Sequence, residues 1–465
     1  MNRRETITIV GAGLVGALLG TLLAQRGFAV TLFERRPDPR RCGFLGGRSI
    51  NLALAERGWH GLRVAGLSDT LKPLAVMMRG RMLHHLDGKT ELLRYGRDDN
   101  EVIWSINRGR LNMALLDAAE AAGARIHFER RLESVDTKMS TMQLCDEAGS
   151  VHEHTAPLLI GADGAGSVLR AAMAQVTALG ERFEPLDHGY KELEIPANFS
   201  FPCAAGEGGR RPEGGRFAME PNALHIWPRG NYMCIALPNA EGSFTVTLFL
   251  PNSGDPSFAT VNSIATARAL FARDFADALA LIPDLDHDFM HNPTGLLGTL
   301  YLDRWHLDGR ALLLGDAAHA IVPFHGQGMN CGFEDAVELA QLMENGANDT
   351  GAVFAEFQHR RKPNADAIAA MALENYVEMR DSVADAHFLL MRALERTLAA
   401  RHPGRFVPRY WMVTFTRIPY AIAFARGEIQ STILREVCVG KTRLEEVDLT
   451  LADRLIGERL PPLPA

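Results

Sequence analysis

The first 34 residues combine two short β-branched runs with one helical apolar pattern. Residues 6–10 (TITIV) form a β-branched run that ends at glycines, and residues 14–26 then carry apolar side chains at helical spacing until Gly27. A second buried-strand pattern, FAVTLF, follows at 28–33. This order predicts a strand, a tight turn, a helix and a second strand. Two strands joined through a helix are parallel, so the chain opens as an α/β domain.

The middle of the chain predicts a second sheet of mainly antiparallel strands. Residues 187–251 are rich in aromatic and β-branched side chains, with strand-like runs at 224–227, 232–237 and 244–250. Pro, Gly and Asn turns separate these runs, which is typical of hairpins. The Gly-, Pro- and Arg-rich stretch 201–215 predicts a mobile surface loop. From residue 333 onward the apolar spacing is helical almost to the end.

Composition adds the class of protein to this picture. A length of 465 residues with 47% hydrophobic and 23% charged side chains allows a large core and about three structural units. A formal net charge of −7 disfavours nucleic acid as a partner. The six cysteines include no C-x-x-C pair, which favours a reducing, cytoplasmic environment. We expect neither an export signal nor a membrane span, because no apolar run reaches about 20 residues.

A glycine-rich turn between the first strand and the first helix is the first candidate site. Gly11, Gly13 and Gly16 form a G-x-G-x-x-G pattern, and Glu34 stands at the end of the second strand. The glycines allow the backbone to lie close to a pyrophosphate at the helix N-terminus, and the acid accepts a hydrogen bond from a ribose hydroxyl. The context of strand, helix and acid predicts a dinucleotide site.

Two further strand ends carry acidic residues followed by glycines. The sequence LLIGADGAGSVLR at 158–170 places Asp163 before Gly164, and LLLGDAAH at 312–319 places Asp316 after a buried strand. A glycine-rich loop at 326–330 then opens a helix. An ordinary strand-turn-helix with Ser167 and Arg170 facing solvent remains the alternative for the first of these stretches.

Together and in this order, the three motifs resemble the sequence signatures of the flavin-dependent aromatic hydroxylases. Further stretches resemble the kynurenine-hydroxylating branch of that family, and they span most of the chain: 47–54, 78–82, 105–108, 188–192, 323–330, 374–379 and 409–410. Eukaryotic members carry a C-terminal membrane anchor, which nothing here matches, so the resemblance implies a soluble form.

The resemblance implies an α/β fold with a Rossmann-like FAD-binding domain, an inserted, mainly antiparallel β-sheet substrate domain and a C-terminal helical region. We expect the discontinuous FAD-binding domain to comprise 1–72, 98–182 and 292–375. The substrate domain is then 73–97 and 183–291, and the helical region is 376–465. That region is expected to cover the substrate pocket as a lid.

The resemblance also implies which residues hold the ligands. The expected FAD-binding residues are Gly11, Gly13, Val15, Gly16, Glu34, Arg35, Arg48, Arg108, Asp163, Asp316, Gly328, Met329 and Asn330. The expected substrate-binding residues are Arg81, Tyr95, Phe324, Asn375 and Tyr410. From the residues alone, a guanidinium suits the carboxylate of an amino acid. Arg79 and Arg81 are two apart on a strand-like stretch and share a face, so the spacing does not choose between them.

The reaction implied is hydroxylation of L-kynurenine with NADPH and O2 through a flavin hydroperoxide, with NADPH as a transient co-substrate. No second dinucleotide motif is present, so NADPH is expected to dock on the flavin domain. His325, beside the flavin loop, is the candidate for proton transfer. The pairs His84–His85 and His152–His154 have no third ligand nearby, and the histidines of 286–291 stand in a loop-like stretch, so we expect no metal. Two alternatives stay open, namely another aromatic acid as substrate and a flavin-binding sensor without turnover; a homodimer is also open.

Overall fold

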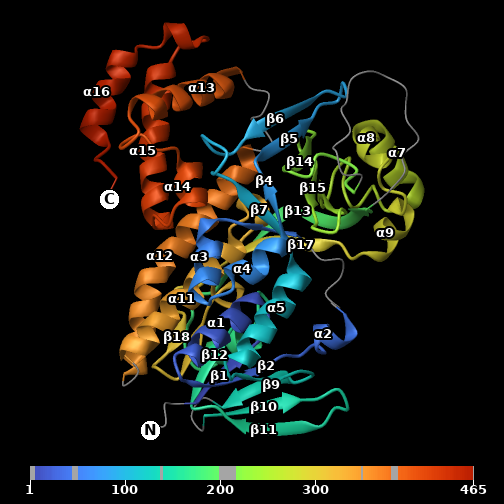
Figure 1. Ribbon diagram of the computed structural model, residues 1–465, viewed down its shortest axis with the longest axis vertical. Coiled ribbons are helices and arrows are strands. Elements are labelled where there is room, and N and C mark those ends of the chain that lie inside the picture. The colour runs from blue at the N-terminus through green and yellow to red at the C-terminus, as the bar shows by residue number, and fades with distance from the viewer. Residues whose placement is uncertain are drawn as a thin grey trace.

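The computed structural model describes residues 6–43, 51–136, 140–197, 216–346, 349–378 and 386–463. Arg48 and the loop expected at 201–215 therefore lie outside the described residues. Figure 1 shows a lower α/β region that contains the N-terminus, a second sheet with its own helices at the upper right, and the C-terminal helices at the upper left. The predicted α/β fold with a C-terminal helical region is confirmed.

The lower region is built on a sheet whose central strands are parallel. Its strand order is β18 (His306–Leu307), β19 (Ala311–Leu313), β12 (Leu158–Gly161), β1 (Thr6–Val10), β2 (Ala29–Phe33) and β8 (Arg125–His127). Helix α1 (Leu14–Gln25) packs against α5 (Arg108–Ala121) and α11 (Gly328–Gly346). The predicted strand, helix and parallel strand at the start of the chain are thus confirmed to within about one residue. Their apolar side chains form the largest buried cluster described.

The second sheet is antiparallel except where β14 pairs with β5. Its strand order is β17 (Gly295–Tyr301), β13 (Arg182–Ile195), β16 (Phe244–Pro251), β15 (Met233–Pro238), β14 (Ala223–Pro228), β5 (Gly80–His84) and β6 (Thr90–Arg94). Three helices supply apolar side chains to one of its buried clusters: α7 (Ile264–Asp274), α8 (Ala276–Leu279) and α9 (Leu285–His291). Another cluster contains Phe249, Phe324 and Tyr376, and so joins this sheet to the rest of the chain.

The strand-like stretch at 76–86 changes sheets in its middle. Strand β4 (Ala75–Met78) pairs with β7 (Ile103–Asn107), which also pairs with β3 (Asn51–Leu54), whereas β5 belongs to the second sheet. Gly80 follows the break, and a Cβ there would lie 2.3 Å from the Leu93 carbonyl oxygen. The prediction that Arg79 and Arg81 share a face is therefore wrong: Arg79 is exposed at the break, and Arg81 is partly buried on β5.

The remaining elements surround these two sheets. They are the small antiparallel sheet β9 (Arg131–Asp136), β10 (Thr141–Cys145) and β11 (Val151–Thr155), and the helices α2 (Pro39–Cys42), α3 (Glu56–Val64), α4 (Ser68–Leu71), α6 (Val168–Ala174) and α10 (Asp316–His319). The predicted helical end of the chain is confirmed as α12 (Thr350–Val377), α13 (Ala386–Arg401), α14 (Arg409–Phe415), α15 (Tyr420–Cys438) and α16 (Leu449–Arg459).

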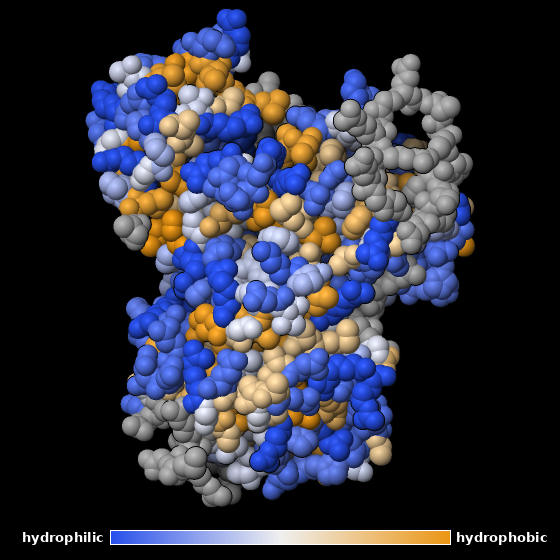
Figure 2. Space-filling view, viewed as in Figure 1, coloured by the Kyte–Doolittle hydropathy of each residue, from blue (hydrophilic) through white to orange (hydrophobic). Residues whose placement is uncertain are grey.

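The C-terminal helices have a small core of their own, with Leu394, Phe406 and Ile433 fully buried. Among the described helices, none has both the length and the apolar character that crossing a membrane requires. Figure 2 shows the apolar side chains of one face in small groups among hydrophilic ones.

Candidate functional site

The glycine-rich turn after β1 has two glycines that the fold needs and one that faces open space. Gly11 has φ +96°, and a Cβ there would lie 2.4 Å from the Ala162 carbonyl oxygen. At Gly16 a Cβ would lie 2.0 Å from the Gly11 oxygen, so α1 packs directly on the turn. At Gly13, the N-cap of α1, a Cβ would meet no described atom within 4 Å. The helix N-terminus is thus open to an anion at Gly13.

Glu34 fixes this turn from the end of the neighbouring strand. Its carboxylate accepts hydrogen bonds from the backbone N–H of Ala12 at 2.9 Å and of Arg36 at 3.0 Å. Two carboxylate oxygens offer about four lone pairs, so capacity remains for a ribose hydroxyl. Arg35 is exposed beside it.

A buried arginine links the loop after β12 to the motif after β19. Arg170 donates to the carbonyl oxygens of Ala165 at 2.7 Å and Ala317 at 3.1 Å. Ser167, also buried, caps α6 by accepting from the Arg170 N–H. The alternative in which Ser167 and Arg170 face solvent is therefore wrong.

Asp163 has one committed and one uncommitted carboxylate oxygen. Its Oδ2 accepts from the N–H groups of Val168 at 2.8 Å and Leu169 at 3.2 Å. Its Oδ1 is buried and has no hydrogen-bond partner among the described residues. Burial raises the pKa of this carboxyl group. A buried polar atom without a partner marks a place where a ligand supplies the missing hydrogen bond.

The sheet order explains why these motifs meet. Strands β2, β1, β12 and β19 are parallel neighbours, so the residues that follow them gather at one edge of the sheet. Val15 brings the first and third motifs into contact, because a Cβ on Gly315 would lie 3.3 Å from its Cγ2. Asp316 follows Gly315 and is exposed at this edge. An open helix end, a free carboxylate oxygen and two further acids fit an extended dinucleotide such as FAD.

The loop predicted to face the flavin is fixed by a fully buried amide. The Oδ1 of Asn330 accepts from the N–H groups of Ala55 at 2.9 Å and Gly58 at 3.2 Å. Its Nδ2 donates to the carbonyl oxygens of Ala53 at 2.8 Å and Gly326 at 2.9 Å. The side chain of Asn330 is thus fully used in holding the loop. Two other expected residues, Gly328 and Met329, are partly exposed at the start of α11.

Replacing Asp316 by asparagine should weaken FAD binding about tenfold, because one charge-assisted hydrogen bond contributes roughly 1.5–3 kcal/mol. The melting temperature of the FAD-free protein should stay unchanged, since Asp316 is exposed. Titration of FAD into the FAD-free protein, followed by flavin fluorescence, measures the effect. Asp308→Asn is the control, because Asp308 is an exposed carboxylate paired with Arg304. Equal FAD affinities of Asp316→Asn and wild type would contradict the assignment.

Arg108 lies at the N-terminus of α5 and near the second sheet. It is exposed, and its charge acts on Glu192 and Tyr190 of β13. Burial raises the pKa of Glu192 to about 7, and Arg108 lowers it in part. Arg108 thus lies where the two sheets face each other.

The pKa of Glu192 predicts a pH-dependent stability. Glu192 has a pKa of about 7 in the folded protein and an ordinary pKa of 4.5 in the unfolded chain, so between these pH values the folded protein binds more protons at this carboxyl group. The free energy of unfolding therefore falls as the pH rises through that range. The free energy of unfolding of Glu192→Gln, relative to that of wild type, should therefore be larger at pH 8 than at about pH 5. Urea unfolding at both pH values measures this, with Glu184→Gln, an exposed acid on the same strand, as control. A stability difference that is equal at both pH values would contradict it.

Three predicted substrate residues from distant parts of the chain form one cluster. The Arg81 guanidinium carbon, on β5, lies 5.7 Å from the ring centroid of Tyr95 and 5.8 Å from that of Tyr410, on α14. The two rings stack at 5.8 Å with an interplanar angle of 20°. Because two phenol rings hold the arginine, its guanidinium loses little conformational entropy when it binds a carboxylate through two N–H groups.

Phe324, Asn375 and His325 join this cluster to the flavin loop. Asn375 donates through Nδ2 to the Phe324 carbonyl oxygen at 2.6 Å. The His325 ring stacks on Tyr410 with centroids 5.6 Å apart, and its Nδ1 is buried without a partner among the described residues. Burial lowers the pKa of His325 to about 4, so the ring is neutral at pH 7.

A cavity of about 410 Å³ adjoins these residues on the side of the C-terminal helices. His325, Asn375 and Tyr410 line it together with charged side chains that the sequence analysis did not single out, namely Glu374, Glu378, Arg392, Glu395, Arg409, Glu428 and Arg435. Arg409 pairs with Glu374 at 2.6 Å. Glu374, Glu378 and Arg409 lie in the stretches 374–379 and 409–410, whose family resemblance was the sequence signal that could have found them.

One group of side chains among the described residues has the composition of a metal site: His319, Cys331 and Asp335. The Nε2 of His319 lies 2.6 Å from Asp335 Oδ2, and the Arg361 Nε donates to Asp335 Oδ1 at 2.7 Å. These contacts hold the pKa of Asp335 at about 2 despite its burial. The arginine already balances the charge that a cation would balance, so the trio is a structural network.

The family model described as FAD binding domain matches residues 4–186 and 280–372. The kynurenine 3-monooxygenase of Xanthomonas axonopodis pv. citri (strain 306) is 57% identical over 461 residues, which cover 99% of this chain and 98% of that protein. The kynurenine 3-monooxygenase of Xanthomonas campestris pv. campestris (strain 8004) is 57% identical over 460 residues, with the same coverage.

Solved structures with lower identity share the fold. The tetrameric form of 2-methyl-3-hydroxypyridine-5-carboxylic acid oxygenase has a TM-score of 0.61 and 22% identity, covering 82% of this chain and 94% of that one. Pseudomonas aeruginosa PqsL in complex with 2-aminobenzoylacetate has a TM-score of 0.62 and 21% identity, covering 81% and 97%.

Proposed function

The chain belongs to the kynurenine 3-monooxygenase family of FAD-binding monooxygenases, and we propose that it hydroxylates L-kynurenine to 3-hydroxy-L-kynurenine. The balanced reaction consumes one L-kynurenine, NADPH, H⁺ and O2, and yields 3-hydroxy-L-kynurenine, NADP⁺ and water. The observation that carries the proposal is the cluster of Arg81, Tyr95 and Tyr410 in a chain that is 57% identical to such an enzyme over its full length. A cytoplasmic location, supported by cysteine usage, is part of the proposal.

Bound FAD supplies the redox chemistry, because it carries the two electrons of NADPH to O2. The residues that would hold it are Gly13 at the N-terminus of α1, Glu34, Asp163 and Asp316. Val15 and Gly315 bring the motifs together behind them. The uncommitted Oδ1 of Asp163 supports this arrangement.

The substrate cluster binds and orients the amino acid. Arg81 would clamp the α-carboxylate through two parallel N–H donors, and the phenols of Tyr95 and Tyr410 line the clamp. Burial raises the pKa of both phenols, so both remain protonated and able to donate a hydrogen bond. This would fix the aromatic ring of the substrate toward the flavin loop.

Apolar rings exclude water from the space between the sheet and α12. Phe324 packs against Phe249 with centroids at 5.2 Å and against Tyr376 at 4.5 Å. A dry site suppresses premature loss of hydrogen peroxide. His325 stays a candidate for moving a proton, since its neutral ring has an Nδ1 that lacks a partner among the residues the structure describes.

Substrate-stimulated NADPH oxidation tests the proposal. We expect L-kynurenine to accelerate NADPH oxidation by the FAD-loaded protein and to be converted in equal amount. Kynuramine, which lacks the α-carboxylate, is the matched control and should stimulate far less, because Arg81 has nothing to clamp. Stimulation and product with another aromatic acid only would favour a different substrate, and no stimulation by any would favour a flavin-binding sensor.

A further inference from the structure

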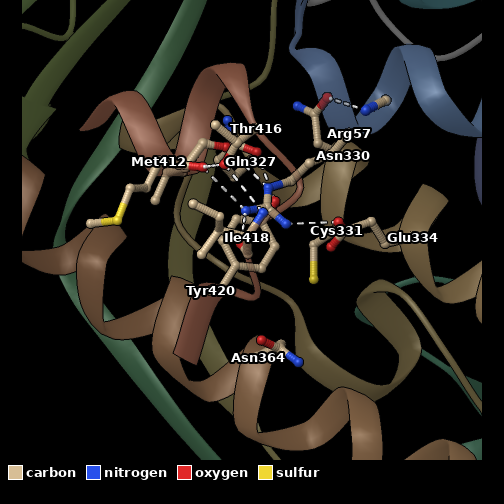
Figure 3. Close-up of polar contacts among 12 residues, drawn as sticks. Arg57, Gln327, Asn330, Cys331, Glu334, Asn364, Met412, Thr416, Ile418 and Tyr420 are labelled. Atoms are coloured by element: carbon tan, nitrogen blue, oxygen red, sulfur yellow. Dashed lines mark hydrogen bonds and ion pairs between the residues drawn. The ribbon is translucent and has the colours of Figure 1, made fainter. Parts of the chain in front are cut away.

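A buried arginine outside the predicted site holds the C-terminal helices against the flavin domain. Arg57, the second residue of α3, is 1% exposed. Its Nε donates to the Val413 carbonyl oxygen at 3.0 Å, and its Nη2 donates to those of Met412 and Ile418. Figure 3 shows this guanidinium turned into the segment that joins α14 to α15. One side chain thus satisfies carbonyl groups in the last turn of α14 and in the connection to α15.

Tyr420 carries this contact to the flavin-facing loop. The Arg57 guanidinium lies 3.9 Å from the centroid of the Tyr420 ring, which is fully buried. The Tyr420 hydroxyl donates to Oε1 of Gln327 at 2.8 Å. Gln327 is 3% exposed and stands between Gly326 and Gly328, in the loop predicted to lie against the flavin. Figure 3 shows Arg57, Tyr420 and Gln327 next to one another.

The same network contacts the substrate cluster through α14. This helix carries Tyr410 near its start, and Met412 and Val413, whose carbonyl groups Arg57 holds, lie within one turn of it. Tyr410 packs on Arg81. The position of the carboxylate clamp and the position of the Gln327 loop therefore depend on one set of hydrogen bonds.

The charge of Arg57 is balanced within the protein. Its Nη1 donates to Glu334 Oε1 at 2.7 Å, and Glu334 Oε2 accepts from Arg361 at 3.2 Å. Arg361 in turn pairs with Asp335. Two guanidinium groups thus face two carboxylates, and the charge of Arg57 is neutralised. The position of α14 therefore depends on the planar geometry of the Arg57 guanidinium, whose N–H groups point at the carbonyl oxygens, and not on its charge alone.

We propose that Arg57 and Tyr420 are positioning residues that fix the Gln327 loop relative to the helix carrying Tyr410, and thereby keep NADPH consumption coupled to hydroxylation. This rests on the proposed function. In the coupled reaction one oxygen atom goes to the ring and the other to water. In the uncoupled reaction NADPH, H⁺ and O2 give NADP⁺ and H2O2, and the substrate is unchanged. A loop displaced from the substrate cluster favours the second outcome.

Tyr420→Phe tests the proposal, because it removes the hydroxyl that reaches Gln327 and keeps the ring against Arg57. At saturating L-kynurenine we expect the peroxide formed per NADPH to rise about two- to tenfold, the factor that one neutral hydrogen bond gives. The KM for L-kynurenine should change less than twofold. Tyr232→Phe is the matched control, since its hydroxyl donates to Asp274 at 2.7 Å in the second sheet region. It should leave the peroxide yield at the wild-type level.

Two more variants separate positioning from general destabilisation. Gln327→Leu should raise the peroxide yield as Tyr420→Phe does, and the double variant should show no further rise, because both lose the same bond. Arg57→Lys keeps the charge opposite Glu334 but not the fork, and should also raise the yield. An unchanged peroxide yield in folded Tyr420→Phe, or an equal rise in Tyr232→Phe, would overturn the proposal.

A readout independent of turnover keeps this test separate from the proposed function. The visible circular dichroism of bound FAD reports the protein around the flavin. Tyr420→Phe should change that spectrum, and Tyr232→Phe should not. If wild type forms no hydroxylated kynurenine while this difference appears, the proposed function fails and the positioning of the loop stands. If the spectrum of Tyr420→Phe equals that of wild type, the positioning role fails.

Discussion

Replacing Arg81 by methionine should raise the KM for L-kynurenine about a hundredfold, which corresponds to roughly 3 kcal/mol for a desolvated ion pair. Methionine keeps an unbranched stem and removes the guanidinium that the rings of Tyr95 and Tyr410 hold. FAD affinity should remain at the wild-type level, because Arg81 lies on β5 of the second sheet, away from the strand ends that carry the dinucleotide motifs. Steady-state kinetics with a parallel FAD titration measure both quantities.

Arg79→Met is the control for this experiment. Arg79 is two residues away and exposed, and its backbone rather than its side chain makes the contacts at the break between β4 and β5. Its KM should stay within about twofold of wild type, as for surface substitutions. An unaltered KM in Arg81→Met, or equal losses in both variants, would remove Arg81 from the substrate site.

Gly16→Ala should lower the stability of the FAD-free protein, whereas Gly13→Ala should lower the affinity for FAD and leave that stability unchanged. At Gly16 a Cβ would lie 2.0 Å from the Gly11 oxygen, so Gly16→Ala should destabilise the FAD-free protein by about 1–3 kcal/mol. At Gly13 it meets no described atom within 4 Å, so the FAD-free protein should keep its melting temperature. The added methyl group would instead occupy the space of the pyrophosphate, and FAD affinity should fall about tenfold or more.

Thermal unfolding of both FAD-free variants, together with FAD titration, separates the two roles. Gly13→Ala with wild-type affinity would show that the open end of α1 does not hold the cofactor. A drop in its melting temperature comparable to that of Gly16→Ala would show that the space at Gly13 is required by the fold instead.

The parts of the fold that sequence could predict are those set by local periodicity. Residues 6–33 carry two strand-like apolar runs around one helical apolar pattern. Their two parallel strands and helix are therefore predicted nearly to the residue. That the three motifs serve one flavin site was expected only from the family resemblance. The structure supplies the physical reason, because the residues after parallel strands meet at one edge of the sheet. The gathering of Arg81, Tyr95 and Tyr410 was expected only from the resemblance.

What sequence missed depends on contacts between distant segments. Nothing local shows that the chain changes sheets at Gly80, since the choice is made by the pairing of β5 with β14. Arg170 reads as a surface charge until Ala317, far along the chain, supplies its acceptor. Arg57 is likewise one charge among many until the end of α14 folds onto it. Buried arginines of this kind carry no periodic signal.

Hydroxylation of L-kynurenine by this protein is tested most directly by the mass of the product formed in isotopically heavy O2. The FAD-loaded protein is incubated with NADPH and L-kynurenine, and the product is analysed by mass spectrometry. We expect 3-hydroxy-L-kynurenine that carries one heavy oxygen atom and forms only when NADPH is present. NADPH oxidation that yields hydrogen peroxide and unchanged kynurenine, or a product whose added oxygen comes from water, would contradict it.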